Sequence, residues 1–240
     1  MKDNKSSLSA LAWPLAAGIA RKVSRPRLAE LGREIMVALK DAGGLPAIWL
    51  DEIRCLSETD IPCHLNNGAI IAIVAKLMGA KNVFEFGTYD GQTTALVAKE
   101  NPQCAVVTLD LPVEDYSGAV ALSAVEVSDE YLFQGVARGQ FIPPEAAVTQ
   151  IRMDSAIFDP EPYAGKMDLI YIDASHSYSG VKNDTEKALR MLAPHGVIIW
   201  DDYYYPGVWR YLNELDEERP DLKMRRIRQW AKAITTRGLM

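Results

Sequence analysis

The sequence has few cysteines and histidines, the residues that stabilise small folds through disulfides or bound metal ions. Among its 240 residues are three cysteines and three histidines, and no Cys-x-x-Cys spacing occurs. A disulfide framework is therefore excluded, and we expect the cysteines to be small buried side chains in a reducing, cytoplasmic compartment. No apolar run reaches the ~18–20 residues of a membrane span, so the sequence predicts no transmembrane helix.

An excess of basic charge is also missing. The 26 Lys and Arg residues are outnumbered by 32 Asp and Glu residues, for a net charge of −6, which argues against a protein that coats nucleic acid. The charge is uneven, because residues 1–40 and 219–240 are both basic and residues 41–218 are strongly acidic. An acidic middle suits a metal or a cationic ligand, although a solvated acidic surface is the commoner reason for such a balance.

The first 60 residues differ from the rest of the chain, and we interpret 1–60 as a helical N-terminal extension. Leu8–Ala20 is apolar and resembles a short secretory segment, but Pro14 interrupts it, which favours an ordinary docking helix. A basic helix lying on a membrane surface is a weaker alternative, and we expect no membrane partner. Arg27–Ala42 has apolar residues at helical spacing, so the extension is a candidate contact between two copies in a homo-oligomer.

From residue 61 onward, short apolar strands alternate with helices. The expected strands are 82–87, 104–110, 149–153, 168–173, 196–200, 222–227 and 231–237, and the expected helices are 69–78, 93–100, 178–192 and 207–217. Strands that are apolar on both faces predict a doubly wound α/β fold with a mostly parallel sheet. The last two strands are too close in sequence for a crossover helix, so we expect an antiparallel hairpin. The stretch 111–148 has no clear pattern and is a candidate substrate lid.

Acidic residues follow nearly every strand of this predicted sheet. Ligands of open α/β sheets bind beyond the carboxyl ends of the strands. These ends carry Asp110, Asp154-Ser155, Asp173 and Asp201-Asp202. Clustered carboxylates repel one another, so packing alone does not explain their presence at one edge.

The loop after the first strand predicts a nucleoside site. Gly87 and Gly91 allow a sharp turn close to a ligand, and Asp110 ends the next strand, where a carboxylate can accept both ribose hydroxyls. The loop lacks the Gly-x-Gly-x-x-Gly spacing that cradles a pyrophosphate, and its acids Glu85 and Asp90 would repel phosphate. A cationic nucleoside without phosphate fits better, and S-adenosylmethionine is such a molecule. An ordinary tight turn is the alternative.

The motifs at residues 83–91, 168–178 and 196–203 carry a family resemblance. Val-Phe-Glu-Phe-Gly-Thr-Tyr-Asp-Gly, the first of them, resembles the first motif of class I S-adenosylmethionine-dependent methyltransferases. The other two are similar to metal-dependent small-molecule O-methyltransferases, especially the macrolide-sugar O-methyltransferases and cephalosporin-hydroxylase-like proteins, and more distantly catechol O-methyltransferase. The resemblance implies a seven-stranded sheet with an antiparallel C-terminal strand, in a methyltransferase domain over residues 61–240.

The resemblance also implies the site residues. Glu85, Gly87, Thr88, Tyr89, Gly91, Asp110, Asp154 and Ser155 would bind S-adenosylmethionine, and Asp173, Asp201 and Asp202 would bind Mg²⁺ or another divalent cation. His176 would be the general base beside the catalytic Asp173. Two purely structural alternatives stay open. Asp201 and Asp202 could cap a helix without metal, and His176 could only cap or pack at a strand end.

The sequence thus predicts a Mg²⁺-assisted O-methyltransferase that acts on a hydroxyl of a small molecule such as a natural product, sugar or phenol. We expect a small-molecule acceptor and no nucleic-acid partner. Two rival functions remain: a nucleotide-dependent oxidoreductase on a similar sheet, and a non-catalytic nucleoside-binding protein. A fold alone does not decide among them, because one fold hosts many functions.

Overall fold

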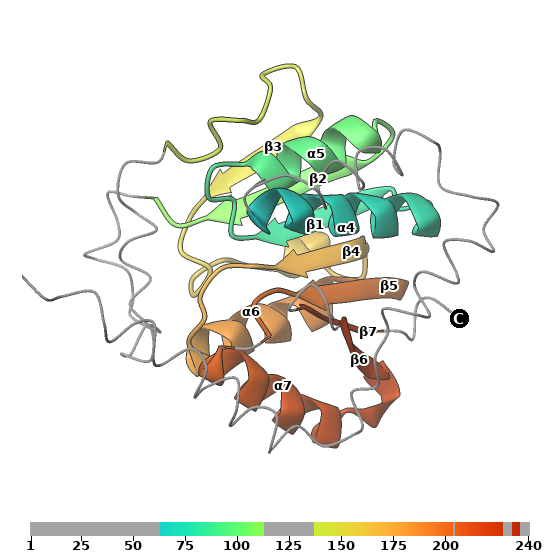
Figure 1. Ribbon diagram of the computed structural model, residues 1–240, viewed down its shortest axis with the longest axis vertical. Coiled ribbons are helices and arrows are strands. Elements are labelled where there is room, and N and C mark those ends of the chain that lie inside the picture. The colour runs from blue at the N-terminus through green and yellow to red at the C-terminus, as the bar shows by residue number, and fades with distance from the viewer. Residues whose placement is uncertain (1–62, 113–136, 204, 228–231, 236–240) are drawn as a thin grey trace, which may run out of the picture.

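Figure 1 shows the computed structural model, which describes residues 63–112, 137–203, 205–227 and 232–235. The expected N-terminal extension, its contact between copies and most of the candidate lid at 111–148 lie outside the described residues. Among the helices that the structure describes, none combines the length and apolar character needed to cross a lipid bilayer.

The centre of the fold is a seven-stranded sheet in the order β3-β2-β1-β4-β5-β7-β6. Its strands are β1 (Asn82–Phe86), β2 (Ala105–Asp110), β3 (Val148–Arg152), β4 (Met167–Ile172), β5 (Leu192–Trp200), β6 (Met224–Ile227) and β7 (Lys232–Thr235). The first five strands are parallel, whereas β7 runs antiparallel to both β5 and β6. The predicted α/β class, the mostly parallel sheet and the terminal hairpin are confirmed.

Helices cover both faces of this sheet. The helices are α4 (Cys63–Met78), α5 (Gln92–Glu100), α6 (Tyr178–Met191) and α7 (Pro206–Glu218), with short 3₁₀ turns at Glu161–Tyr163 and Pro220–Leu222. Buried side chains of α4 and α5 pack with one face of the strands, and those of α6 and α7 pack with the other. Burial on both faces explains why the central strands β1, β2 and β4 lack an alternating apolar pattern.

Local signals fix where the two helices on the site side begin. The Ser177 hydroxyl accepts a hydrogen bond from the Gly180 amide and caps α6. Pro206 opens α7 at a position where a missing backbone N–H costs nothing. These starts follow β4 and β5 directly, and the strands' carboxyl ends point to the left in Figure 1. The site therefore forms where strands end and helices begin.

Candidate functional site

Strand register places four sequence-predicted residues in one row across the sheet. Phe86 pairs with Leu109 and with Ile172, and Ile172 pairs with Trp200. The next residues along these strands are Asp110, Gly87, Asp173 and Asp201. Backbone hydrogen bonds continue into the row, because the amides of Gly87, Asp173 and Asp201 donate to the preceding row at 2.8, 2.8 and 2.9 Å. The expected gathering of acids at one edge is present.

Gly87 is the point at which the loop after β1 passes against the loop after β4. Its φ is +97°, and a Cβ there would lie 2.0 Å from the backbone oxygen of Asp173. Gly91 has a φ of +85° and is the N-cap residue that precedes α5. Tyr89 lies between them with a φ of +48°, which is unusual for a side chain of that size. The loop is thus a strained, close-packed turn of the kind found at ligand sites.

The side chains of Glu85 and Thr88 lie beneath this loop. Glu85 is 3% exposed, and its carboxyl accepts hydrogen bonds from the hydroxyls of Thr94 and Thr108, the latter at 2.7 Å. The hydroxyl of Thr88 pairs with that of Thr108 at 2.6 Å. Burial raises the pKa of Glu85 from 4.5 to about 7. Their hydrogen bonds thus tie β1 and the start of the loop to β2 and α5.

Glu85→Gln is expected to gain stability relative to the wild type as the pH rises from about 5 to about 8. The unfolded chain releases the Glu85 proton near pH 4.5, but the folded chain holds it to about pH 7. The free energy of unfolding of the wild type therefore falls as the pH rises through this window. Glutamine keeps an acceptor for the threonines and does not ionise, so the relative gain should approach about 2 kcal/mol. Urea unfolding over this pH range measures it, with exposed Glu145→Gln as control. If the free energies of unfolding of Glu85→Gln and of the wild type changed with pH in parallel, the expectation would be contradicted.

Asp110 ends β2 in the position expected for a ribose acceptor. Its Oδ2 accepts a hydrogen bond from the Tyr89 amide at 3.2 Å and lies 3.3 Å from the Nε of Arg138. Burial raises the pKa of Asp110 to about 6, although the Arg138 charge and nearby backbone amides act against this rise. Sequence reasoning missed Arg138, because no spacing rule links it to β2.

The turn after β3 is held against α6. The carboxylate of Asp154 accepts the Ala156 amide at 2.8 Å, which is a local turn contact. The carbonyl of Ser155 accepts hydrogen bonds from Lys187 and from Asn183, the latter at 3.2 Å. The structure thus places Asp154 and Ser155 at the predicted sheet edge, in a turn fixed by α6.

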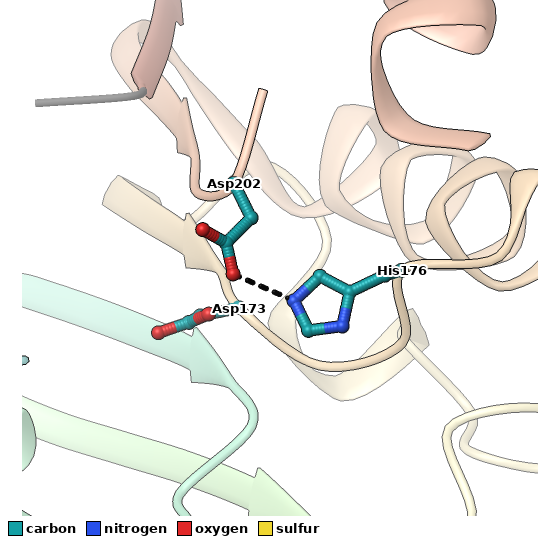
Figure 2. Close-up of side chains that lie close together, drawn as sticks. All are labelled: Asp173, His176 and Asp202. Atoms are coloured by element: carbon teal, nitrogen blue, oxygen red, sulfur yellow. Dashed lines mark hydrogen bonds and ion pairs between the residues drawn. The ribbon is translucent and has the colours of Figure 1, made fainter. Parts of the chain in front are cut away.

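Asp173, His176 and Asp202 converge beyond β4 and β5, and we refer to them as the Asp–His–Asp cluster. One ligand-type atom from each lies within 4.8 Å of the other two. The His176 Nε2 is 2.8 Å from a carboxylate oxygen of Asp202, and Figure 2 shows Asp173 beside this pair. The ring of His176 stacks on Tyr205 at 4.3 Å between centroids. Asp202 has a φ of +49°, so a strained backbone accompanies this arrangement.

Asp201 has other partners than the Asp–His–Asp cluster. It is 5% exposed, accepts a hydrogen bond from the Tyr171 hydroxyl, and forms an ion pair with Lys232, which is fully buried. The Tyr171 hydroxyl also lies 2.8 Å from Asp173 and so bridges the two carboxylates. The structure therefore brings Asp173 and Asp202 together with His176 and places Asp201 behind them. Tyr171 and Lys232 were missed, although a lysine in the apolar run 231–234 was a visible signal.

Lys232→Met is expected to lower the free energy of unfolding by about 3 kcal/mol, because it leaves the buried Asp201 carboxylate without its cation. Lys182→Met is the matched control, since the Lys182 side chain is 49% exposed and pairs with Glu186 across one helical turn. That change should cost less than about 0.5 kcal/mol. Urea unfolding measures both. The double variant Asp201→Asn/Lys232→Met should recover part of the loss, and equal losses for both lysines would contradict the expectation.

The charges around the cluster favour a cation. Three carboxylates lie here with one buried lysine, and burial together with the neighbouring Asp201 raises the pKa of Asp173 well above its usual range. The carboxylate oxygens of Asp173 and Asp202 are ligands that divalent metal ions accept. The residues present therefore fit a divalent cation held by Asp173 and Asp202.

The aromatic residues after β5 serve mainly in packing. Tyr203 is 2% exposed, and its hydroxyl accepts a hydrogen bond from Asn213 at 3.0 Å. Trp209 packs against the core under α7. Of this group, Tyr205 touches the cluster through its stack on His176. His195 is exposed near the amino end of β5, far along the strand from the site.

Comparisons with known proteins identify the family and the fold. The family model described as a methyltransferase domain matches residues 84–203, half of the chain. An SAH-bound methyltransferase of Podospora anserina is 15% identical, with a TM-score of 0.50 over 84% of this chain and 92% of that one. A protein of Staphylococcus aureus described as a caffeoyl-CoA O-methyltransferase is 17% identical, with a TM-score of 0.50 over 85% and 98%. These structures share the fold. No curated protein matches the sequence.

Proposed function

Because the chain belongs to the S-adenosylmethionine-dependent methyltransferases, we propose that it transfers the donor's methyl group to a hydroxyl oxygen of a small molecule. The observation that carries the proposal is the Asp–His–Asp cluster. It lies in the same row of strand ends as the loop of residues 87–91, which we call the donor loop. The family match favours this reaction over an oxidoreductase or a non-catalytic nucleoside-binding protein. A hydroxyl acceptor needs a base, and His176 supplies one.

The donor would bind along the loop of residues 87–91. Asp110 would accept hydrogen bonds from the ribose hydroxyls, and Asp154 with Ser155 would line the adenine. The close turn at Gly87 lets the backbone approach the methionine part of the donor, while Glu85 and Thr88 support the turn from below. Tyr89 is 37% exposed, so its ring is available at the mouth of this site.

Asp173 and Asp202 would hold a divalent cation, Mg²⁺ being the ion most suited to carboxylates and water, and Asp201 would add negative charge from behind. When bound, such an ion makes a coordinated hydroxyl more acidic and fixes its position. Lys232 offsets one of the three carboxylate charges. The cluster therefore keeps enough negative charge to attract a cation.

In the transfer step, His176 would take the proton of the acceptor hydroxyl. The acceptor oxygen forms a bond to the methyl carbon as the bond from that carbon to the donor sulfur breaks, and the sulfonium becomes a neutral thioether. Asp202 orients the imidazole through its 2.8 Å contact, and the stack on Tyr205 fixes the plane of the ring. Much of the rate gain would come from holding oxygen and methyl carbon in line.

Calorimetric titration with S-adenosylhomocysteine (SAH) and S-adenosylmethionine, each with and without Mg²⁺, tests the donor site first. We expect micromolar binding of both, and NAD⁺ should not bind. A screen of sugars, phenols and polyketide-like alcohols with S-adenosylmethionine then tests the acceptor class by mass spectrometry. Methylation that survives a chelator would remove the cation from the proposal, and methylation confined to amines would remove the hydroxyl.

A further inference from the structure

Residues 138–142 pack tightly against the donor loop. The Gly139 amide donates to the Tyr89 carbonyl at 2.8 Å, and the Phe141 amide donates to the Asp90 carbonyl at 3.0 Å. A Cβ on Gly91 would lie 2.9 Å from the Cα of Gly139 and 2.6 Å from Ile142. The loop and this segment therefore fit together with no room for an added methyl group.

Arg138 is held between two parts of the donor site. Its Nε lies 3.3 Å from Asp110 Oδ2, and the two side chains are only 10% and 16% exposed. Its guanidinium carbon lies 5.4 Å from the centre of the Tyr89 ring. An ion pair with so little exposure is less screened than a surface pair, and the ring contact restricts the guanidinium further.

We propose that Arg138 is a positioning residue of the donor site, which keeps the Asp110 carboxylate charged and aimed for the ribose hydroxyls. The inference rests on the proposed function, because it takes Asp110 as the ribose acceptor. Arg138 acts through Asp110 and not through a covalent step. Its effect is therefore on donor affinity.

The charges facing Asp110 support this role. Glu85 from β1 is an acidic neighbour of Asp110 and itself lies near Asp90 of the loop, whereas Arg152 is the register partner of Asp110 on β3. Arg138 is the strongest of the groups that lower the pKa of Asp110 against the effect of burial. Without Arg138 the carboxyl would keep its proton to higher pH. A protonated carboxyl accepts two ribose hydroxyls less well, because one of its oxygens carries hydrogen.

The test is calorimetric binding of SAH over about pH 5.5 to 8.5. At pH near 7, Arg138→Met should bind SAH about tenfold more weakly than the wild type, with affinity recovering as the pH rises. Arg138→Lys, which keeps the charge, should restore most of the affinity. In an Asp110→Asn background, Arg138→Met should add no pH-dependent weakening. Arg190→Met, at a side chain that is 58% exposed, is the matched control and should bind like the wild type.

Three results would overturn the inference. Unchanged SAH affinity in Arg138→Met would mean that Arg138 has no effect on donor binding, and higher SAH affinity would mean that Arg138 competes with the donor for Asp110. Equal weakening at every pH, with no rescue by Arg138→Lys, would mean that it only packs. Normal SAH binding by Asp110→Asn would refute the ribose assignment itself, which separates failure of the proposed function from failure of this inference. Circular dichroism checks that each variant is folded.

Discussion

His176→Ala is expected to lower kcat for methyl transfer by about a thousandfold while SAH binding stays within about twofold. The imidazole is the base of the proposed reaction, and its Nε2 contact with Asp202 and its stack on Tyr205 hold it at the cluster. These two contacts lie beyond β4 and β5 and not in the loop after β1, so removing the ring should spare donor affinity. Single-turnover kinetics with the acceptor identified in the screen, beside SAH calorimetry, measure the two effects separately.

His195→Ala is the matched control for this variant. It makes the same substitution at an exposed histidine on the same sheet, near the amino end of β5. Its kcat and SAH affinity should match those of the wild type. Wild-type kcat in His176→Ala would show that another group takes the proton, and a parallel loss of SAH affinity would show that the ring acts in donor binding.

Gly87→Ala should cost more than about 4 kcal/mol of folding free energy, because the new methyl group would overlap backbone atoms of Asp173. The Cβ would lie 2.0 Å from the Asp173 carbonyl oxygen and 2.6 Å from its carbon, at a φ of +97°. The donor loop and the loop carrying Asp173 would have to separate. Urea unfolding should show the loss, and any folded fraction should fail to bind SAH.

Gly165→Ala separates the clash from the backbone effect. Gly165 also has a positive φ, +66°, but a Cβ there meets nothing within 4 Å. That change should cost only about 1 kcal/mol, the penalty for a left-handed alanine. If both variants lost the same stability, close approach at Gly87 would not be the reason for its glycine.

Much of the fold could be predicted because the information is local. Short apolar runs between helices imply a covered parallel sheet, and the brief gap between the last two strands implies the hairpin. The strand ends also predicted that acids gather at one edge of the sheet, since parallel strands in register end together. One strand boundary differs from the prediction, because β5 begins at Leu192, four residues before the predicted start at Gly196.

The side-chain partners could not be predicted, because they depend on contacts between distant elements. In the sequence, the adjacent acids Asp201 and Asp202 cannot be told apart. In the structure, Asp202 contacts His176, whereas Asp201 forms an ion pair with Lys232. That difference depends on β7, which lies about thirty residues further along the chain. Arg138 reaches Asp110 in the same way from a segment outside the sheet. Neither contact has a sequence signature.

The row of strand ends has a consequence for how this chain can change in evolution. Side chains alternate between the two faces of a strand, so one inserted or deleted residue within β4 would turn Asp173 to the opposite face or move it out of line with Gly87. Length changes in the loops beyond the row leave the register intact. Insertions beyond the strand ends would therefore change the surroundings of the site and keep the row, whereas a change of length within these strands would break it.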